Sequence, residues 1–339
     1  MSGACLYRCP ICYARAYPWS QVERIVIYEN LTEKLKQELD KAKIIFPIYL
    51  SQVTDPLQPY QEIRTKTEKI VQLLLSYELS FGIVTKSADG PLWLLKRVPE
   101  LIGYPYWFLT ITVESVPAKQ VVTSPFASPI LDRLKTIRYF NQLGIKAICR
   151  IDPVLLGLLN ERDVLWLVKQ GACAGSNHII ASTGYFNKVS MMRVIEAFKQ
   201  SAYKKNLPGF LKFYRVNLSK IDSVDERKRF MVSLPIRKEF HTWLRQEVEA
   251  LGMTYAVCQE LPKEFDSKNI PSCEGAENIF VLIKDPNGKF KPINCHGDCL
   301  RNCPNPDSPP CGEKRFLTTY PYHPKLLYTP ESQLSLNWN

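Results

Sequence analysis

Hydrophobic and polar positions along residues 30–182 follow two periods in turn. Short, nearly continuous apolar runs stand between longer segments in which apolar residues recur at helical spacing. The runs predict buried strands, and the periodic segments predict amphipathic helices. The predicted strands cover residues 44–51, 80–86, 106–114, 145–153 and 177–182. The predicted helices cover residues 30–42, 59–79, 91–101, 128–144 and 160–171, the last two ended by Gly144 and Gly171.

Apolar strands that alternate with helices are typical of a parallel sheet covered on both faces. The repeats predict an α/β fold, specifically a partial (β/α)6 barrel, whose functional residues lie at the C-terminal ends of the strands. The pattern changes after residue 185, with helices predicted at 189–205 and 236–252, a strand at 253–259 and a hairpin at 278–293. We therefore expect a barrel core over 1–185 and a C-terminal α+β extension over 186–339.

Composition narrows the class of protein. No run of 18 apolar residues occurs, and the first residues lack the apolar segment of a signal peptide, so we expect a cytoplasmic protein with no membrane contact and reduced thiols. The chain holds 11 cysteines, and its Lys and Arg exceed its Asp and Glu by 11.

Three of the cysteines, Cys5, Cys9 and Cys12, form a C-x3-C-x2-C pattern followed by Tyr13. A tetrahedral zinc site requires a fourth ligand, which this segment does not supply. Three thiolates can instead bind three irons of a 4Fe–4S cluster, leaving the fourth iron open to the amino and carboxylate groups of S-adenosylmethionine (SAM). A structural zinc knuckle is the alternative. The pattern resembles the signature of the radical SAM superfamily.

Further motifs stand at the predicted strand ends. They read Thr54-Asp55-Pro56-Leu57-Gln58-Pro59, Thr85-Lys86, Thr110 and Arg150-Ile151-Asp152-Pro153. In this order they resemble the spore photoproduct lyase family, over roughly residues 1–185. The resemblance implies a radical SAM enzyme that cleaves SAM reductively to a 5′-deoxyadenosyl radical, and the family name carries the labels lyase and DNA repair.

The resemblance also implies roles for these residues toward SAM. Thr54 and Asp55 stand where the superfamily binds the SAM amine, although an Asx-type turn would explain the same residues. Lys86 and Arg150 each offer a cation for the SAM carboxylate. Thr110 offers a hydrogen bond, and Tyr13 either lies against the adenine or merely packs.

The sequence departs from the lyase pattern in two places. The lyase has a hydrogen-donating cysteine just before the Ser/Thr-Asp step, whereas this chain has Leu50-Ser51-Gln52-Val53. Cys149 does not replace it, because a strand that points Arg150 inward points Cys149 toward the helices. A first barrel strand before Cys5 is also missing, so we expect that it is absent or that the chain is truncated.

A second group of cysteines lies in the C-terminal extension. Cys295, Cys299, Cys303 and Cys311 fall among Pro, Gly, Asn and Asp, with Cys258 and Cys273 upstream. Such a loop cannot form an apolar core, so we expect a second metal site over 295–311 that holds either an iron–sulfur cluster or zinc, with Cys258 and Cys273 as further ligands.

Cations alternate with aromatic residues over 203–220 and 225–230, which favours a nucleic-acid partner, although a solvated basic face gives the same pattern. The predicted function is hydrogen abstraction from a substrate such as a nucleic-acid base or sugar, with electrons from an external flavodoxin or ferredoxin. Two alternatives stay open: a peptide-modifying radical SAM enzyme with an auxiliary cluster, and a non-catalytic nucleic-acid-binding protein stabilised by metal.

Overall fold

The computed structural model describes residues 4–16, 24–51, 53–225, 228–299 and 303–317. Its centre is a six-stranded, parallel sheet in the order β2-β3-β4-β5-β6-β9. The strands are β2 (Ile48–Leu50), β3 (Phe81–Thr85), β4 (Trp107–Thr112), β5 (Ala147–Ile151), β6 (His178–Ala181) and β9 (Thr254–Val257). The predicted partial barrel is therefore confirmed, and its sixth strand comes from the C-terminal extension.

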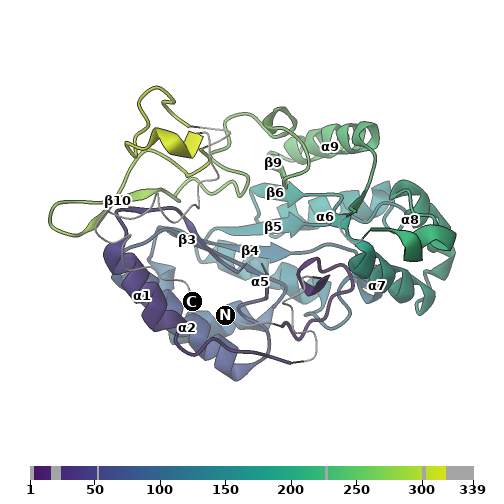
Figure 1. The fold of residues 1–339 in the computed structure, drawn as a ribbon, viewed down its shortest axis with the longest axis horizontal. Helices are drawn as coiled ribbons and strands as arrows, with labels where there is room; N and C mark the ends of the chain where they lie inside the picture. Colours follow the sequence, from purple (N-terminus) through teal and green to yellow (C-terminus); the bar gives the residue numbers. More distant parts are fainter. Residues whose placement is uncertain (1–3, 17–23, 52, 226–227, 300–302, 318–339) are drawn as a thin grey trace.

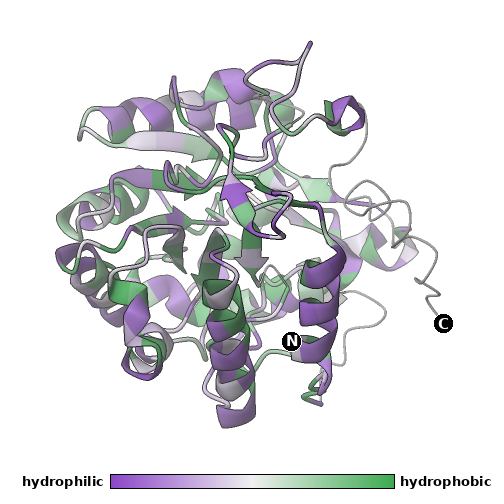
Figure 2. Ribbon diagram, turned by 90° about the vertical axis from the view of Figure 1, so that its left-hand side faces the viewer, coloured by the Kyte–Doolittle hydropathy of each residue, from purple (hydrophilic) through white to green (hydrophobic). Residues whose placement is uncertain are grey.

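Helices cover this sheet, with α1 and α2 along one side and α7 and α8 at one end (Figure 1). The helices of the core are α1 (Leu31–Lys41), α2 (Gln61–Ser76), α3 (Asp89–Arg97), α4 (Gln120–Thr123), α5 (Ile130–Gln142) and α6 (Glu161–Cys173). Those that follow are α7 (Lys188–Lys199), α8 (Leu207–Phe213) and α9 (Leu234–Glu249). Hydrophilic and hydrophobic residues are mixed along them, as amphipathic helices require (Figure 2).

Two predicted boundaries are wrong for identifiable reasons. The predicted strand 44–51 is two strands, because Pro47 lacks the N–H that a continuous ladder needs. Its first half, β1 (Ile44–Ile45), joins the β10–β11 hairpin instead of the barrel. Helix α6 also continues past Gly171 to Cys173, since the absent side chain of Gly171 makes room for Cys149: an added Cβ would lie 3.3 Å from its Sγ.

The hairpin prediction is confirmed. Strands β10 (Leu282–Lys284) and β11 (Phe290–Pro292) pair antiparallel around a turn in which Gly288 has a φ of +79°. With β1 they form a three-stranded sheet, and a two-stranded sheet joins β7 (Tyr185–Phe186) to β8 (Phe230–Met231). No helix in the described part of the chain is long and apolar enough to cross a membrane.

Candidate functional site

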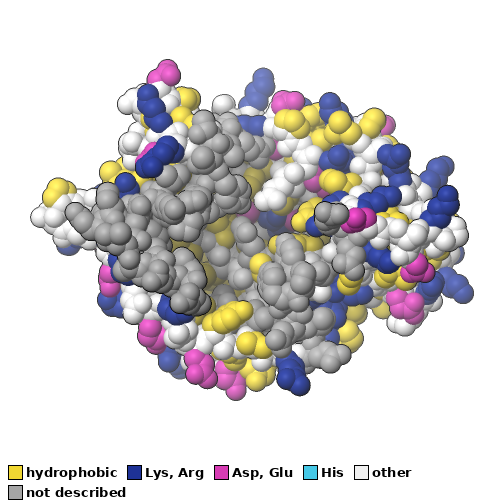
Figure 3. Space-filling view, in the orientation of Figure 1, with side chains coloured by type: hydrophobic (Ala, Val, Ile, Leu, Met, Phe, Trp, Pro, Cys, Tyr) yellow, Lys and Arg dark blue, Asp and Glu magenta, His cyan; other side chains and the backbone are white. Residues whose placement is uncertain are grey.

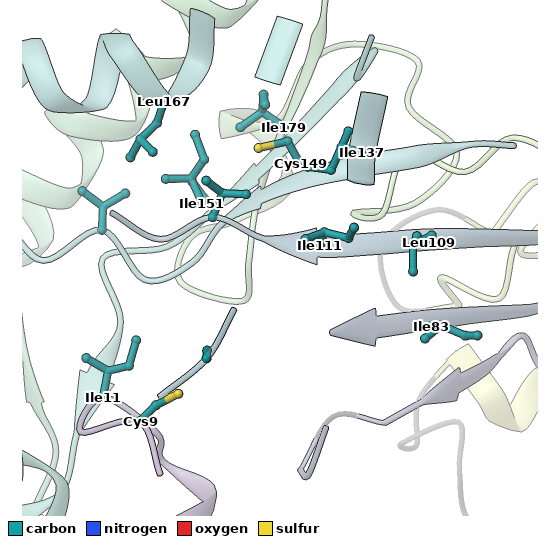
Figure 4. Close-up of a cluster of buried hydrophobic side chains, with 14 of the residues drawn as sticks. Cys9, Ile11, Ile83, Leu109, Ile111, Ile137, Cys149, Ile151, Leu167 and Ile179 are labelled. Carbon is teal, nitrogen blue, oxygen red and sulfur yellow. The ribbon is translucent and has the colours of Figure 1, made fainter. Parts of the chain in front are cut away.

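The three-cysteine loop lies at the C-terminal ends of the barrel strands. Figure 4 shows Cys9 beyond the arrowhead of β4, the strand that carries Leu109 and Ile111. Two tight turns shape the loop: the Arg8 N–H donates to the Cys5 carbonyl at 3.3 Å, and the Cys12 N–H donates to the Cys9 carbonyl at 3.1 Å. The loop itself has no regular secondary structure before the short 3-10 helix Ala14–Ala16.

Gln58 links the loop to the barrel. Gln58 is fully buried, and its Oε1 accepts a 2.7 Å hydrogen bond from the Leu6 N–H. Its Nε2 donates to the Ala4 carbonyl at 3.3 Å and to the Asp55 carbonyl at 3.0 Å. This gives the glutamine of the Thr-Asp-Pro-Leu-Gln-Pro segment a structural role that sequence reasoning did not assign.

The thiols of this loop form no disulfide and have little contact with solvent. Cys9 is buried, Cys5 and Cys12 are half-buried, and no disulfide joins any cysteine in the described part of the chain. Burial and the nearby Asp55 carboxylate raise the pKa of Cys5 to about 12. Burial likewise raises the pKa of Cys9, while the Lys86 ammonium acts in the opposite direction.

Thiols with raised pKa values lose their protons when they bind a metal cation. Iron ions supply the required positive charge. The three thiols therefore fit three irons of a 4Fe–4S cluster. Within the described residues, no three His, Cys, Asp or Glu side chains have the spacing of a site for one ion. A cluster makes a different demand, because each thiolate binds an iron of its own.

Lys86 follows β3 and points its ammonium at a buried carboxylate. Its Nζ lies 3.0 Å from Oε2 of Glu114, a residue with no exposed surface. The same oxygen accepts from Nη1 of Arg133 at 2.9 Å, and Arg133 is equally buried. The hydroxyl groups of Thr123 and Ser124 donate to the other oxygen. Burial raises the pKa of Glu114, but Lys86 and Arg133 outweigh it, so the pKa lies well below its ordinary value.

Asp55 joins the ends of β2 and β3. Its carboxylate accepts from the Thr85 hydroxyl at 2.8 Å, from the Lys86 N–H at 2.6 Å and from the Leu57 N–H at 2.9 Å. The last of these bonds is the Asx-type turn anticipated from the sequence. Thr54 beside it is also buried.

Arg150 and Thr110 meet in the barrel interior on a carboxylate from the C-terminal extension. Glu274 accepts from Arg150 Nη1 at 3.0 Å and from the Thr110 hydroxyl at 3.2 Å. Arg150 also donates to Asp152 through Nε at 2.8 Å and to the Cys258 sulfur at 2.7 Å. Two of the residues predicted to bind SAM, Arg150 and Thr110, thus already share the carboxylate of Glu274. No local sequence pattern predicted this contact.

The remaining sequence-predicted residues fall into separate places. Tyr13 is partly exposed, and its ring centroid lies 6.2 Å from that of Tyr185. Cys149 is fully buried near Ile137 and Ile179, close to helix α6, as its strand parity predicted (Figure 4). Cys258 and Cys273 both contribute to the electrostatic environment of Arg150, whereas Cys295, Cys299 and Cys311 pack in a separate apolar cluster.

A partial parallel barrel with a three-thiol loop at the C-terminal ends of its strands is the arrangement of the radical SAM class, and the predicted resemblance to that class is confirmed by similarity to known proteins. The chain is 24% identical, over 277 residues, to the Radical SAM Nalpha-GlyT isomerase of Pseudomonas phage M6. That match covers 76% of this chain and 52% of the phage protein, so the chain spans about half the length of the curated relative it matches.

Among solved structures, a mutant of spore photoproduct lyase has a similar fold. The TM-score is 0.53 with 14% sequence identity, and the match covers 76% of this chain and 74% of the lyase. This likeness shows the fold alone. No family model matches the chain.

Proposed function

We propose that the protein is a radical SAM enzyme whose Cys5, Cys9 and Cys12 hold a 4Fe–4S cluster. The observation that carries the proposal is the set of three free thiols on one loop at the C-terminal ends of the strands, with no fourth cysteine on that loop. When bound, the cluster and SAM supply a 5′-deoxyadenosyl radical, which removes a hydrogen atom from the substrate.

The residues of the chain prepare this site in two ways. Gln58 fixes the path of the loop through its bonds to Ala4 and Leu6, so the thiols are preorganised before a cluster binds. Glu114 holds the Lys86 ammonium near the buried Cys9. We assign Lys86 to the SAM carboxylate, and Thr54 and Asp55 to the edge of the SAM amine site, as the resemblance implies.

Arg150 and Thr110 both donate hydrogen bonds to Glu274 in this structure. Because Glu274 already accepts from both, we propose that they reach SAM only together with this carboxylate, or when Glu274 moves aside. Tyr13, with Tyr185 beside it, is the aromatic candidate for the adenine.

Nucleic acid is the substrate class that the charge distribution supports best. Residues 186–238 contain 13 Lys and Arg but four Asp and Glu, which gives a net charge of +9 out of the +11 of the whole chain. Lys and Arg gather over α7 and α8, on the right of Figure 3. We call residues 186–238 the basic lobe. It adjoins the three-cysteine loop, since Arg193 of α7 donates to the Cys12 carbonyl at 2.7 Å. Phosphates bound there would bring a nucleotide to the site.

The phage relative supports a proposal on the type of reaction. It is described as an isomerase, and an isomerisation rearranges bonds without net oxidation of the substrate. We therefore propose a redox-neutral reaction in which the abstracted hydrogen is replaced in the product, within a cytoplasmic setting that supplies electrons through a flavodoxin or ferredoxin.

The test is SAM cleavage after anaerobic reconstitution with iron and sulfide and reduction with dithionite. Wild-type protein should release 5′-deoxyadenosine, and the variant Cys5→Ala/Cys9→Ala/Cys12→Ala should release none. Cys149→Ala is the matched control, because this buried thiol faces helix α6 and should leave cleavage intact. Cleavage by the triple variant at the wild-type rate would contradict the proposal.

A further inference from the structure

The chain from Cys295 to Cys311 contains four cysteines, and its described residues include no helix or strand. The described residues between β11, which ends at Pro292, and the 3-10 helix Lys314–Leu317 form only turns and bends. Most side chains of this loop are Pro, Asn, Asp, Ser or Gly, which offer little apolar surface. Ordering such a segment costs about 1–2 kcal/mol per residue in backbone entropy, so something other than a large core must hold it.

Two of the cysteines are among the buried residues of this loop. Cys295 and Cys299 are 5% and 9% exposed, and they pack with Cys311 against a small apolar cluster. Its other buried members are Ile44, Phe46, Val281 and Phe316. Cys303 follows Cys299 by four residues, and its thiol lies near enough to act electrostatically on Cys299, as the thiols of Cys295 and Cys311 do. The four thiols are therefore neighbours, although Cys295 and Cys311 are 16 positions apart in the sequence.

One backbone N–H points at the Cys295 sulfur. The Gly297 N–H donates to this sulfur at 3.4 Å, which fixes the direction of the side chain. Gly297 has a φ of +82°, and a Cβ there would lie 3.0 Å from Cδ1 of Phe46. A glycine is thus required at the point where the N–H turns toward the sulfur.

Cys258 and Cys273 do not share this environment. Cys258 accepts from Arg150 and packs with residues of the barrel interior, including Phe108 and Ile148. Nδ1 of His296 is within hydrogen-bonding distance of the Ile279 carbonyl, at 2.6 Å, which uses one of its two ring nitrogens. Cys295, Cys299, Cys303 and Cys311 are therefore the thiols that lie near one another in this part of the described structure.

We propose that Cys295, Cys299, Cys303 and Cys311 bind a second metal centre, and that Cys258 and Cys273 are not its ligands. Each thiol would lose its proton to solvent and bind as a thiolate, which is the ligand set of structural zinc and of iron–sulfur clusters. Of the two, we propose the iron–sulfur cluster, in which every thiolate binds an iron of its own, because the N-terminal loop is already proposed to hold a cluster of this kind.

The location gives this centre a structural role. Phe46 and Pro47, which line the loop, immediately precede β2, so they lie toward the N-terminal end of that barrel strand. The three-cysteine loop lies at the opposite ends of the strands, and the two regions are well separated in Figure 1. Binding would fasten residues 295–317 to the β1–β10–β11 sheet, and metal binding contributes directly to folding free energy.

Metal analysis of the variant Cys5→Ala/Cys9→Ala/Cys12→Ala tests this centre independently of the proposed function. After anaerobic reconstitution with iron and sulfide, this variant should retain about four irons, while wild-type protein should hold about eight. About one zinc and no iron in the variant would support the four-thiolate centre but overturn its assignment as an iron–sulfur cluster. A variant without any bound metal would overturn the whole proposal, whether or not wild-type protein cleaves SAM.

Two further variants define the ligands. Cys295→Ser/Cys299→Ser should lose the second metal and become sensitive to protease within residues 290–315, whereas SAM cleavage without substrate should continue. Cys258→Ser/Cys273→Ser is the matched control and should keep the wild-type metal content. Loss of metal from this control, or full metal content in the first variant, would refute the ligand set.

Discussion

Replacing Glu114 by Gln tests whether the buried ion pair under the site determines the stability of the barrel. Glutamine keeps the size of the side chain and one carbonyl oxygen, but it removes the charge that faces Arg133 and Lys86. Glu114 and Arg133 are both 0% exposed, so water cannot compensate the guanidinium that remains. Breaking a fully buried pair typically costs about 3–5 kcal/mol, and Lys86, whose side chain is 20% exposed, loses the same partner.

Urea unfolding at pH 7 under anaerobic conditions measures this cost. With a denaturant slope of about 3 kcal/mol/M for a chain of this size, the midpoint should fall by about 1–1.7 M. Asp132→Asn is the matched control. It breaks the surface pair between Asp132 and Lys135, whose side chains are 47% and 78% exposed, and should cost less than about 1 kcal/mol. If both variants unfold within about 1 kcal/mol of wild type, the buried pair does not stabilise the fold as argued.

Two other predictions concern the stability of the protein at low pH and the binding of DNA to the basic lobe. Because the pKa of Glu114 in the folded protein lies below its unfolded value, its stabilisation is complete above about pH 4.3 and declines as the pH falls further. Stability measured from pH 6 to 3 should fall more steeply for wild type than for Glu114→Gln, and parallel profiles would contradict this origin. Lys204→Glu/Lys205→Glu should weaken binding of a DNA oligonucleotide and reduce its salt dependence, as measured by titration at several salt concentrations. The exposed control Lys135→Glu should change neither, and equal effects of the two would refute a localised nucleic-acid surface.

Much of the fold follows from local patterns in the sequence. The apolar runs at 80–86, 106–114, 145–153 and 177–182 each contain a strand of the barrel. The exceptions have local causes, such as Pro47 dividing one predicted strand. Gly171 resembles a helix terminator in the sequence, but its small size serves packing inside the helix, which the pattern of a single segment cannot distinguish.

Residues of the site could be predicted from the sequence only where they stand at the ends of apolar strands. Lys86 and Arg150 were found in this way, whereas their counter-ions were missed. Glu114 reads as the polar end of a strand, and Glu274 lies 124 residues beyond Arg150 with no local signal. Arg133 did leave a clue, because its spacing from Ile130 and Ile137 puts a cation on the buried face of α5, where an acidic partner is required.

The arrival of β9 as the last strand of the sheet governs how the chain can fold during synthesis. Strand β6 ends at Ala181, and its partner β9 begins at Thr254. Ribosomes add about 5–20 residues per second, so the 72 residues between them take about 4–14 s to produce. During that interval the edge of β6, with its apolar residues Ile179 and Ile180, has no neighbouring strand. The nascent barrel is therefore exposed to strand pairing with other chains until residue 257 is available, and chaperone supply during expression should set the yield of folded protein.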